Sequence, residues 1–376
     1  MYGASEHGFN KLNNDLYLIS LRESDPKYKE SKISELKDSG LFDLVEPNYK
    51  LSLDDNTNSK YVTITKKSEE ENGNMKPVLS PSQEEPDNAR EVTPNDKDFN
   101  AQYYLQEINA PKAWGTTVGD AILIAVLDTG VEGGHPDLMG KAISGSDDEQ
   151  SNLNDDIGHG TEVSGIIAAN TNNNQGIAGV SWNTKIISIR ITDENGQARV
   201  STVVSALENA YQKGAKIVHM SLSTNQFSQT LKNAIKQAQD RGILVVSTAG
   251  NSGIEEIRYP SGFDNVIGVG AVNQNKELET YSTTGGHVGL VAPGSSIYTT
   301  SNGSSYNKVS GTSFAAPQVT GAAALVWSIA PNLTSDEVRN ILLNSADDLG
   351  AAGRDNQYGN GLLNLEKAVK LAKAKN

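Results

Sequence analysis

The sequence predicts an α/β fold, in which a doubly wound parallel sheet follows a small α+β domain at the amino terminus. Continuous apolar runs at residues 121–128 (AILIAVLD) and 242–250 (GILVVSTAG) are typical of strands that are covered on both faces. Helical patterns at residues 201–214 and 228–242 alternate with such strands, and each ends at a glycine. Because strands that alternate with helices form parallel sheets, we expect functional side chains at the carboxyl ends of the strands.

The first part of the chain, residues 1–53, is expected to form the small α+β domain. Residues 15–21 (DLYLISL) alternate apolar and polar side chains, a pattern that predicts a strand. The Ser-Asp-Pro sequence at 24–26 then predicts the start of a helix, and Gly40 its end. Residues 42–53 (FDLVEPNYKLSL) are expected to return as extended chain.

A change in composition separates this domain from the rest of the chain. Residues 54–91 are polar and acidic and contain prolines, which predicts a flexible linker that proteases can reach. Residues 92–376 carry the α/β pattern. There the apolar runs 185–191 (KIISIRI) and 216–223 (KIVHMSLS) predict two more buried strands.

Composition excludes several classes of function. The chain of 376 residues has a net charge of −14, so we expect no nucleic-acid partner. It has no cysteine, which excludes disulfides and thiolate metal sites. No apolar run approaches the roughly 18 residues of a membrane span. The first ten residues lack a basic segment followed by an apolar core, so no signal peptide is expected in this chain.

Three polar residues lie at the predicted strand ends and loop-to-helix junctions where α/β proteins carry functional side chains. Asp128 ends a buried strand in LDTG, His159 lies between glycines in GHGT, and Ser313 lies in SGTSFAAP. Each alone is compatible with a structural role, as a helix cap, a buried histidine or a turn. A serine alcohol needs an imidazole to take its proton and a carboxylate to orient that imidazole. All three residue types in one chain therefore favour a nucleophilic serine.

These segments resemble the three signatures of the subtilisin-like serine proteases, and TPNDKDFNAQYYLQEINAPKAW resembles the mature amino terminus of their thermitase-like branch. The resemblance runs from about residue 92 to 370. It implies a serine endopeptidase that works through an acyl-enzyme intermediate. Asp128 would orient the imidazole, His159 would act as general base and then acid, and Ser313 would attack the scissile carbonyl.

The same resemblance implies how the reaction is stabilised and where the substrate lies. In STAGNSG, Asn251 would donate its side-chain amide to the oxyanion, together with the backbone N–H of Ser313. The family's second histidine is replaced by Glu162, expected to be either a buried acid with a raised pKa or simply hydrogen-bonded. The substrate would add as a strand between two segments of the protein, Gly196, Gln197 and Ala198 on one side and Ser221, Leu222 and Ser223 on the other.

Arg258 bears on specificity. The resemblance places it at the floor of the pocket for the residue before the cut, and Ser252 stands where relatives often have an acid. The positive charge of Arg258 and the absence of an acid at Ser252 together predict cleavage after Glu, with Asp second. The alternative is that Arg258 pairs with Glu255 or Glu256 of its own chain. Arg199, at the rim, has the simpler interpretation of a solvated side chain.

Self-processing is a further implication. Residues 15–53 resemble the second half of the family's propeptide, a chaperone and inhibitor, so the protein's own propeptide is an expected partner beside its peptide or protein substrate. Glu91–Val92 is the expected processing bond, with Glu69 to Glu71 as alternatives. Acid-selective self-cleaving relatives include leader peptidases of lantibiotic pathways, which suggests that role by analogy.

The resemblance also implies a structural calcium site. Its ligands would be side chains of Asp96, Asp137 and Asn173 and the carbonyls of Asn170, Gln175 and Ile177. Oxygen ligands from loops are what calcium prefers. The alternative is a polar surface loop without an ion. His135, within GGHPD, is expected to be structural.

Two rival interpretations stay open. One is a catalytically silent subtilase fold that acts as a binding module, and the other is an intracellular degradative subtilase. We expect a monomer that is secreted or held at the bacterial cell surface, with the cytoplasm as the alternative location.

Overall fold

The structure is a computed structural model that describes residues 8–11, 17–20, 26–39, 44–53, 90–120, 122–146 and 152–376. Most of the expected linker, with Glu69 to Glu71, lies outside the described residues. None of the helices in the described ranges is long and apolar enough to cross a membrane.

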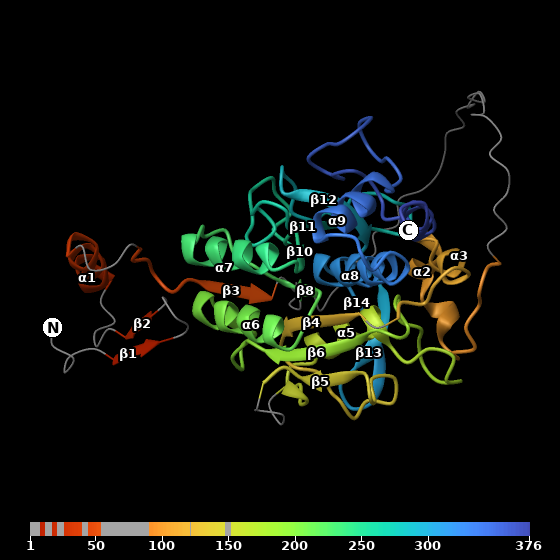
Figure 1. Ribbon diagram of the computed structural model, residues 1–376, viewed down its shortest axis with the longest axis horizontal. Helices are drawn as coiled ribbons and strands as arrows, with labels where there is room; N and C mark the ends of the chain where they lie inside the picture. Colours follow the sequence, from red (N-terminus) through yellow and green to blue (C-terminus); the bar gives the residue numbers. More distant parts are fainter. Residues whose placement is uncertain are drawn as a thin grey trace, which may run out of the picture.

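A parallel sheet of seven strands forms the centre of the protein, as the sequence predicted (Figure 1). Its order is β12-β11-β10-β8-β4-β6-β5. The strands are β4 (Leu123–Asp128), β5 (Ala142–Ser144), β6 (Lys185–Arg190), β8 (Ile217–Met220), β10 (Leu244–Thr248), β11 (Ile267–Val272) and β12 (Val288–Pro293). The fold class is therefore confirmed.

Alternate side chains of each central strand enter different cores, which explains why the strand sequences are apolar throughout. In β4, Ile124 and Val126 join one buried cluster, while Ala125 and Leu127 join the other. The helices α6 (Val200–Gln212) and α7 (Gln229–Asp240) supply the second cluster. The first cluster contains α5 (His159–Ala168), α8 (Thr312–Ile329), α9 (Ser335–Asn344) and α10 (Leu365–Lys373).

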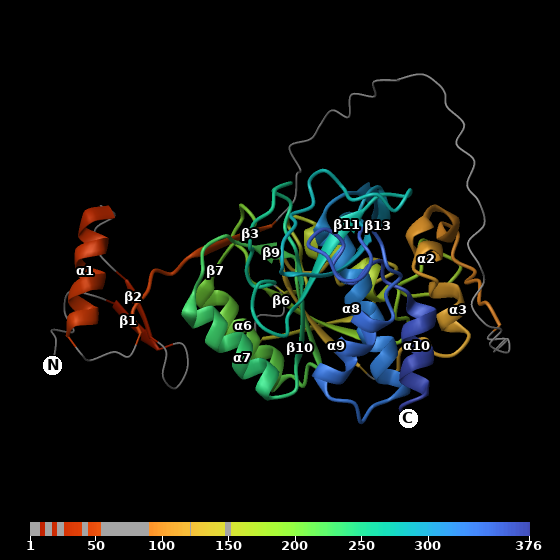
Figure 2. The same ribbon diagram turned by 90° about the horizontal axis from the view of Figure 1, so that it is seen from above.

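Shorter elements complete the body. A hairpin pairs β13 (Ile297–Ser301) with β14 (Ser305–Val309). Before the sheet, the chain forms η1 (Phe99–Ala101), α2 (Tyr103–Glu107) and α3 (Ala110–Trp114). Figure 2 shows α2 and α3 on the side of the body opposite to the amino-terminal elements.

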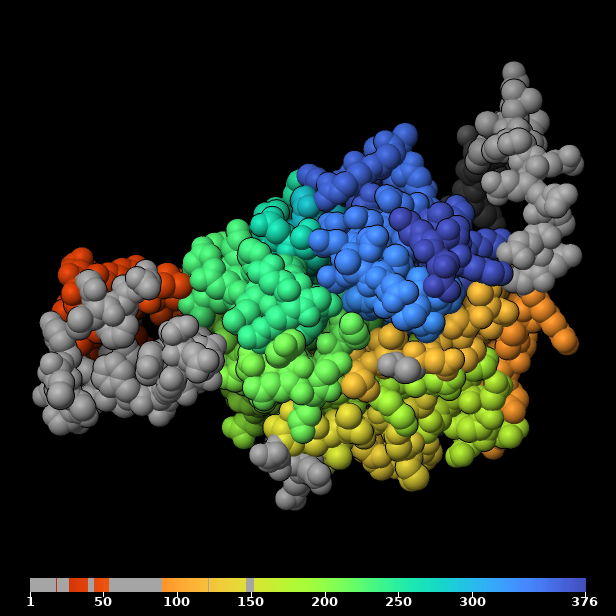
Figure 3. Space-filling model, in the orientation of Figure 1, coloured from red at the N-terminus to blue at the C-terminus, as the bar shows by residue number. Residues whose placement is uncertain are grey.

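The amino-terminal part follows the predicted order of strand, helix and extended chain, with β2 (Tyr17–Ser20), α1 (Pro26–Asp38) and β3 (Lys50–Leu53). The sequence did not predict β1 (Gly8–Lys11), which pairs with β2. Helix α1 stands at one end of the molecule (Figure 3). In contrast, β3 runs into the body, where it lies between β7 (Gln197–Arg199) and β9 (Leu222–Ser223).

Candidate active site

Asp128 and His159 are in direct contact at the carboxyl edge of the sheet. Asp128 is the last residue of β4 and His159 the first residue of α5. The His159 Nδ1 atom lies 2.7 Å from Asp128 Oδ1, and the two side chains are only 2% and 1% exposed. Asp128 Oδ1 also accepts a hydrogen bond from the backbone N–H of Thr129 at 2.8 Å. The carboxylate thus holds one ring nitrogen of the imidazole in a dry environment.

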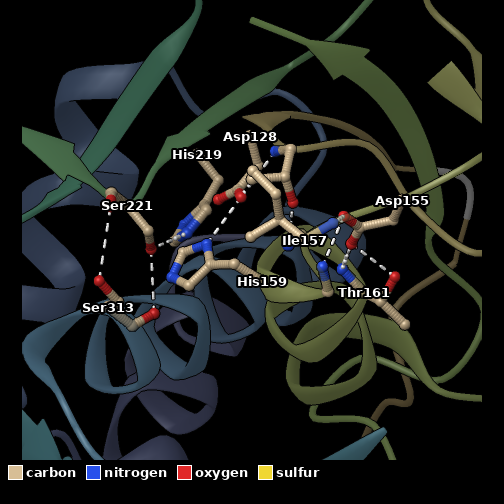
Figure 4. A network of polar contacts seen from close by, with 11 residues as sticks. Asp128, Asp155, Ile157, His159, Thr161, His219, Ser221 and Ser313 are labelled. Carbon is tan, nitrogen blue, oxygen red and sulfur yellow. Dashed lines mark hydrogen bonds and ion pairs between the residues drawn. The ribbon is translucent and has the colours of Figure 1, made fainter. Parts of the chain in front are cut away.

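The start of α5 is fixed by a second carboxylate, that of Asp155 (Figure 4). It accepts hydrogen bonds from the backbone N–H groups of Gly158 at 2.7 Å and of Thr161 at 2.8 Å, and from the Thr161 hydroxyl at 2.7 Å. A negative charge is favourable at a helix amino terminus. Gly160 is required next to His159, because a Cβ atom there would lie 2.0 Å from the Gly130 carbonyl oxygen.

Ser313 is the second residue of α8, and Phe314 packs its ring 5.5 Å from the His159 ring. The Ser313 hydroxyl donates to the Ser221 carbonyl oxygen at 3.4 Å, and the Ser313 carbonyl accepts from the Ser221 hydroxyl at 2.9 Å. That carbonyl is free for Ser221 because Pro317, four residues on, has no N–H to donate. Figure 4 shows the His159 ring between Asp128 and the helix that carries Ser313.

Asn251 faces the start of the same helix. Its Oδ1 atom accepts from the Thr312 backbone N–H at 2.9 Å and from the Thr312 hydroxyl at 2.7 Å. Its Nδ2 atom is buried and has no hydrogen-bond partner among the described residues. A Cβ atom on Gly311 would lie 3.3 Å from that nitrogen. A buried amide donor without a partner, at the start of the helix that carries Ser313, is the geometry that an oxyanion would complete.

The two segments expected to hold a substrate are occupied by the protein's own chain. Strand β3 pairs antiparallel with β7 through Leu51 and Ala198, and with β9 through Leu53 and Leu222. The Leu53 backbone N–H donates to the Gly196 carbonyl oxygen at 3.3 Å. Both segments and the extended chain at residues 42–53 were expected from the sequence, but their pairing was not.

Arg258 lies beside these strands and the Asn251 segment. Its Nε atom donates to the Ser223 hydroxyl at 2.9 Å, and its Nη1 atom lies 3.2 Å from Glu256 Oε1. The contact with Glu256 is one of the two alternatives that the sequence left open, and Glu255 instead accepts from Asn356. Ser252 contacts Thr283, through both its backbone N–H and its hydroxyl, at 2.9 Å.

His219, which the sequence did not mark as functional, lies in β8 behind Ser313. Its Nε2 atom is 2.8 Å from the Ser221 hydroxyl and its Nδ1 atom 2.8 Å from the Thr320 hydroxyl. Burial, and secondarily the charge of His159, lower the pKa of His219 to about 3. Its only sequence signal was a histidine within the apolar run KIVHMSLS. A neutral imidazole therefore orients Ser221, which in turn contacts Ser313.

Two other polar residues have ordinary hydrogen-bonding roles. Glu162 is half-buried and accepts from the Asn307 amide at 3.3 Å, in agreement with the hydrogen-bonded alternative. His135 is buried, with Nε2 3.0 Å from the Ser305 carbonyl oxygen and Nδ1 accepting from the Asp137 backbone N–H. Both ring nitrogens of His135 are thus engaged by backbone groups.

The expected calcium ligands do gather around one loop. Asp96 accepts from the backbone N–H groups of Asn172 and Asn173 at 3.0 and 3.2 Å. Asp137 accepts from the Asn173 amide, the Ile177 backbone N–H and the Tyr306 hydroxyl, at 2.7, 2.8 and 2.9 Å. Burial, and to a lesser degree the charge of Asp137, raise the pKa of Asp96.

This donor set fits a hard cation in composition. A cation would relieve the repulsion between the two carboxylates, and the Asn173 amide would have to turn its oxygen inward. Asn170 and Gln175 lie in the same loop, where Asn170 donates its N–H to the Asp137 carbonyl and Gln175 donates to Asn173 Oδ1. Within the described ranges, no group of three or more His, Cys, Asp or Glu side chains gathers to hold a metal.

Comparison with known proteins gives a consistent result. Residues 119–361 match the model of the subtilase family. The chain is 38% identical to thermitase of Thermoactinomyces vulgaris over 74% of this chain and 99% of that protein. It is 41% identical to a thermophilic serine proteinase of Bacillus sp. (strain AK1), over 71% of this chain and 67% of the relative.

A solved structure of a protease from Pseudoalteromonas arctica matches with a TM-score of 0.68. The match covers 75% of this chain and all of that one, at 28% identity. Sequence and fold thus agree over the part of the chain that holds Asp128, His159 and Ser313. The chain belongs to the subtilase family of serine peptidases.

Proposed function

We propose that this subtilase is an active endopeptidase that cuts extended peptides with Asp128, His159 and Ser313. The observation that carries the proposal is the buried 2.7 Å contact between Asp128 and His159, beside the amino terminus of the helix that bears Ser313. A carboxylate is costly to bury, and that of Asp128 is held against the imidazole at the start of α5. A silent binding module would not need this pair beside a serine at a helix amino terminus.

In the proposed mechanism each of these groups has one role. His159 takes the proton of the Ser313 hydroxyl as its oxygen attacks the substrate carbonyl, and Asp128 stabilises the resulting imidazolium. The oxyanion accepts hydrogen bonds from the Asn251 amide and the Ser313 backbone N–H, at the positive end of α8. His159 then gives the proton to the leaving amine, and water releases the acyl group by the reverse sequence.

The direct test is to trap the acyl group. A nitrophenyl ester should give a burst of nitrophenol and a mass increase on the peptide that contains Ser313. The His159→Ala variant should lose the burst while it keeps its fold by circular dichroism. Equal turnover in the wild-type protein and the variant would refute the proposed mechanism.

Selectivity for an acidic residue before the cut is a finer proposal. It is supported by the guanidinium of Arg258, which already binds one carboxylate, that of Glu256, beside β9. A substrate carboxylate that replaces Glu256 would gain a charge-assisted contact in a partly buried place. Peptides that differ only in Glu, Gln or Leu at that position would decide, and equal kcat/KM for Gln and Glu would exclude the idea.

Self-processing and calcium binding are further proposals. Glu91–Val92 is a candidate bond. Val92 donates its N–H to the carbonyl of Pro111 in α3 at 2.9 Å, and α3 lies on the side of the body opposite to β3 (Figure 2). A secreted or cell-surface enzyme that cuts a lantibiotic leader peptide after an acidic residue would fit this selectivity. We further propose three parts of the chain: an amino-terminal propeptide-like domain (residues 1–53), a linker (54–91) and a catalytic domain (92–376).

Calcium is proposed to link Asp96 and Asp137 to the loop at 170–177. When bound, the ion would supply stability and no chemistry. Chelation should lower Tm, and the Asp96→Asn variant should lose that dependence, whereas Asp264→Asn, an exposed acid elsewhere, should keep it. An unchanged Tm on chelation of the wild-type protein would exclude the site.

A further inference from the structure

The segment that runs from β8 into β9 points its side chains alternately to two sides. One set joins the buried apolar cluster that contains α6 and α7, and it consists of Val218, Met220 and Leu222. The other set is polar and at most 1% exposed, and it consists of His219, Ser221 and Ser223. Polar side chains are costly to bury unless each has a hydrogen-bond partner, so the partners of the second set indicate its purpose.

Two of these partners belong to the active site. The Ser221 hydroxyl donates to the Ser313 carbonyl oxygen at 2.9 Å, and the Ser223 hydroxyl accepts from Arg258 Nε at 2.9 Å. In α8 the usual helical donor to the Ser313 carbonyl is missing, because Pro317 has no N–H. The Ser221 hydroxyl supplies that hydrogen bond and so ties the first turn of α8 to the strand.

The hydrogen atoms of this network follow from its donors. The one hydrogen of the Ser221 hydroxyl is used on Ser313, so its oxygen accepts from His219 Nε2 at 2.8 Å. Burial lowers the pKa of His219 to about 3, and in the neutral ring Nδ1 therefore accepts from the Thr320 hydroxyl at 2.8 Å. The Thr320 hydroxyl has a longer contact of 3.2 Å with the Ala316 carbonyl oxygen. Figure 4 shows the part of the network that joins His219, Ser221 and Ser313.

Ser313 is thus held against Ser221 by both its backbone and its side chain. The Ser313 hydroxyl donates to the Ser221 carbonyl at 3.4 Å, which is long for a hydrogen bond between oxygen atoms. This weak bond lets the hydroxyl turn toward His159 for the reaction, whereas the shorter bond at the Ser313 carbonyl keeps the backbone in place. Without the donor at His219, the Ser221 hydroxyl would be free to rotate away from that carbonyl.

We propose that His219 is a positioning residue, which acts through Ser221 to hold Ser313 in the place where it reacts. The proposal deepens the proposed peptidase function and rests on it. In this role His219 transfers no proton: its Nε2–H orients the Ser221 hydroxyl, and that hydroxyl fixes the carbonyl of Ser313. Displacement of a reacting group by about 1 Å can slow a reaction about 100-fold, so this network should affect the rate measurably.

Two variants of similar polarity distinguish the two ring nitrogens. The side-chain amide of Gln reaches the place of Nε2, whereas that of Asn reaches only the place of Nδ1. His219→Gln therefore keeps a donor to Ser221, and His219→Asn keeps only a partner for Thr320. Burst kinetics of the full chain with a nitrophenyl ester measure the rate of acylation and the dissociation constant of the ester separately.

His219→Asn should acylate at least about tenfold more slowly than the wild type, with a dissociation constant changed by less than about twofold. His219→Gln should recover the rate to within about threefold of the wild type. A residue with a structural role alone would lower Tm in both variants and leave equal acylation rates at temperatures well below Tm.

A second arm leaves the imidazole in place. Ser221→Ala removes the linking hydroxyl and should slow acylation as much as His219→Asn does. The double variant should be at most about threefold slower than Ser221→Ala, because both residues act through one contact. Thr184→Val is the matched control, since Thr184 is 0% exposed and bonded to Ser181 at 2.6 Å before the start of β6. It should lower Tm and leave the acylation rate unchanged.

The outcomes separate the two proposals. If Ser313 is acylated but His219→Asn and Ser221→Ala react within about threefold of the wild type, the inference about His219 is wrong and the peptidase function stands. It is also wrong if the losses of the two single variants multiply in the double variant. If the wild-type protein gives no burst and forms no acyl group on Ser313, the proposed function itself fails.

Discussion

Four helices begin around the cleft, and they fall into two pairs. The amino termini of α6 and α7 are capped by Asn48 and Glu46, which belong to the amino-terminal part of the chain. Those of α5 and α8 carry His159 and Ser313 and face the site. The starts of α5 and α8 are capped as well, by Asp155 and by the Asn251 oxygen, but these caps come from the body and hold His159 and Ser313 in place. The same backbone feature thus supports docking on one side and chemistry on the other.

The largest expected effect is a loss of catalytic rate at the side of the cleft where α5 and α8 begin. Replacement of Asn251 by Leu removes the amide donor that has no partner among the described residues. It should lower kcat about 100- to 1,000-fold and change KM little, since the oxyanion exists only in the transition state. Steady-state kinetics on one peptide would show this. An equal rise in KM would point to a role in binding the substrate.

Changes to the caps of α6 and α7, which hold the amino-terminal segment in place, should have smaller effects. Loss of a helix cap costs about 0.5–2 kcal/mol, so Glu46→Ala or Asn48→Ala should each loosen β3 about 2- to 30-fold. In the Ser313→Ala background, this would appear as faster hydrogen exchange at the amides of residues 50–53. Glu35→Ala, at an exposed position of α1, is the matched control. Unchanged hydrogen-exchange rates in both cap variants would show that Glu46 and Asn48 do not hold β3 in place.

The last expected effect is on stability and concerns His219, which lies behind Ser313. The pKa of His219 is lowered to about 3 in the folded protein. Between about pH 6.5 and pH 3 this histidine is therefore protonated in the unfolded chain but neutral in the folded protein. Stability should therefore fall as the pH falls from about 6.5 toward 3, by at most about 1.4 kcal/mol per pH unit from this group. Thermal unfolding of Ser313→Ala at pH 7 and pH 5 should show the loss, and a further His219→Asn change should reduce it. Identical pH slopes for the two proteins would contradict this role.

Local patterns predicted the fold well because buried strands have apolar runs. The run at 121–128 became β4, and the extended segment predicted at 42–53 contains β3. The pairing of Lys50 with Arg199 was not predictable, since it depends on contacts between residues far apart in the sequence. His219 was missed for a related reason: a histidine inside an apolar run gives no sign of the hydroxyls that its ring will meet.

The central claim is that Ser313, activated by His159, is the nucleophile, and fluorophosphonate labelling tests it most directly. The account predicts that the wild-type protein is labelled on Ser313 alone, as peptide mass analysis would show, and that Ser313→Ala and His159→Ala are not labelled. A wild-type protein that is folded and still unlabelled would contradict the account.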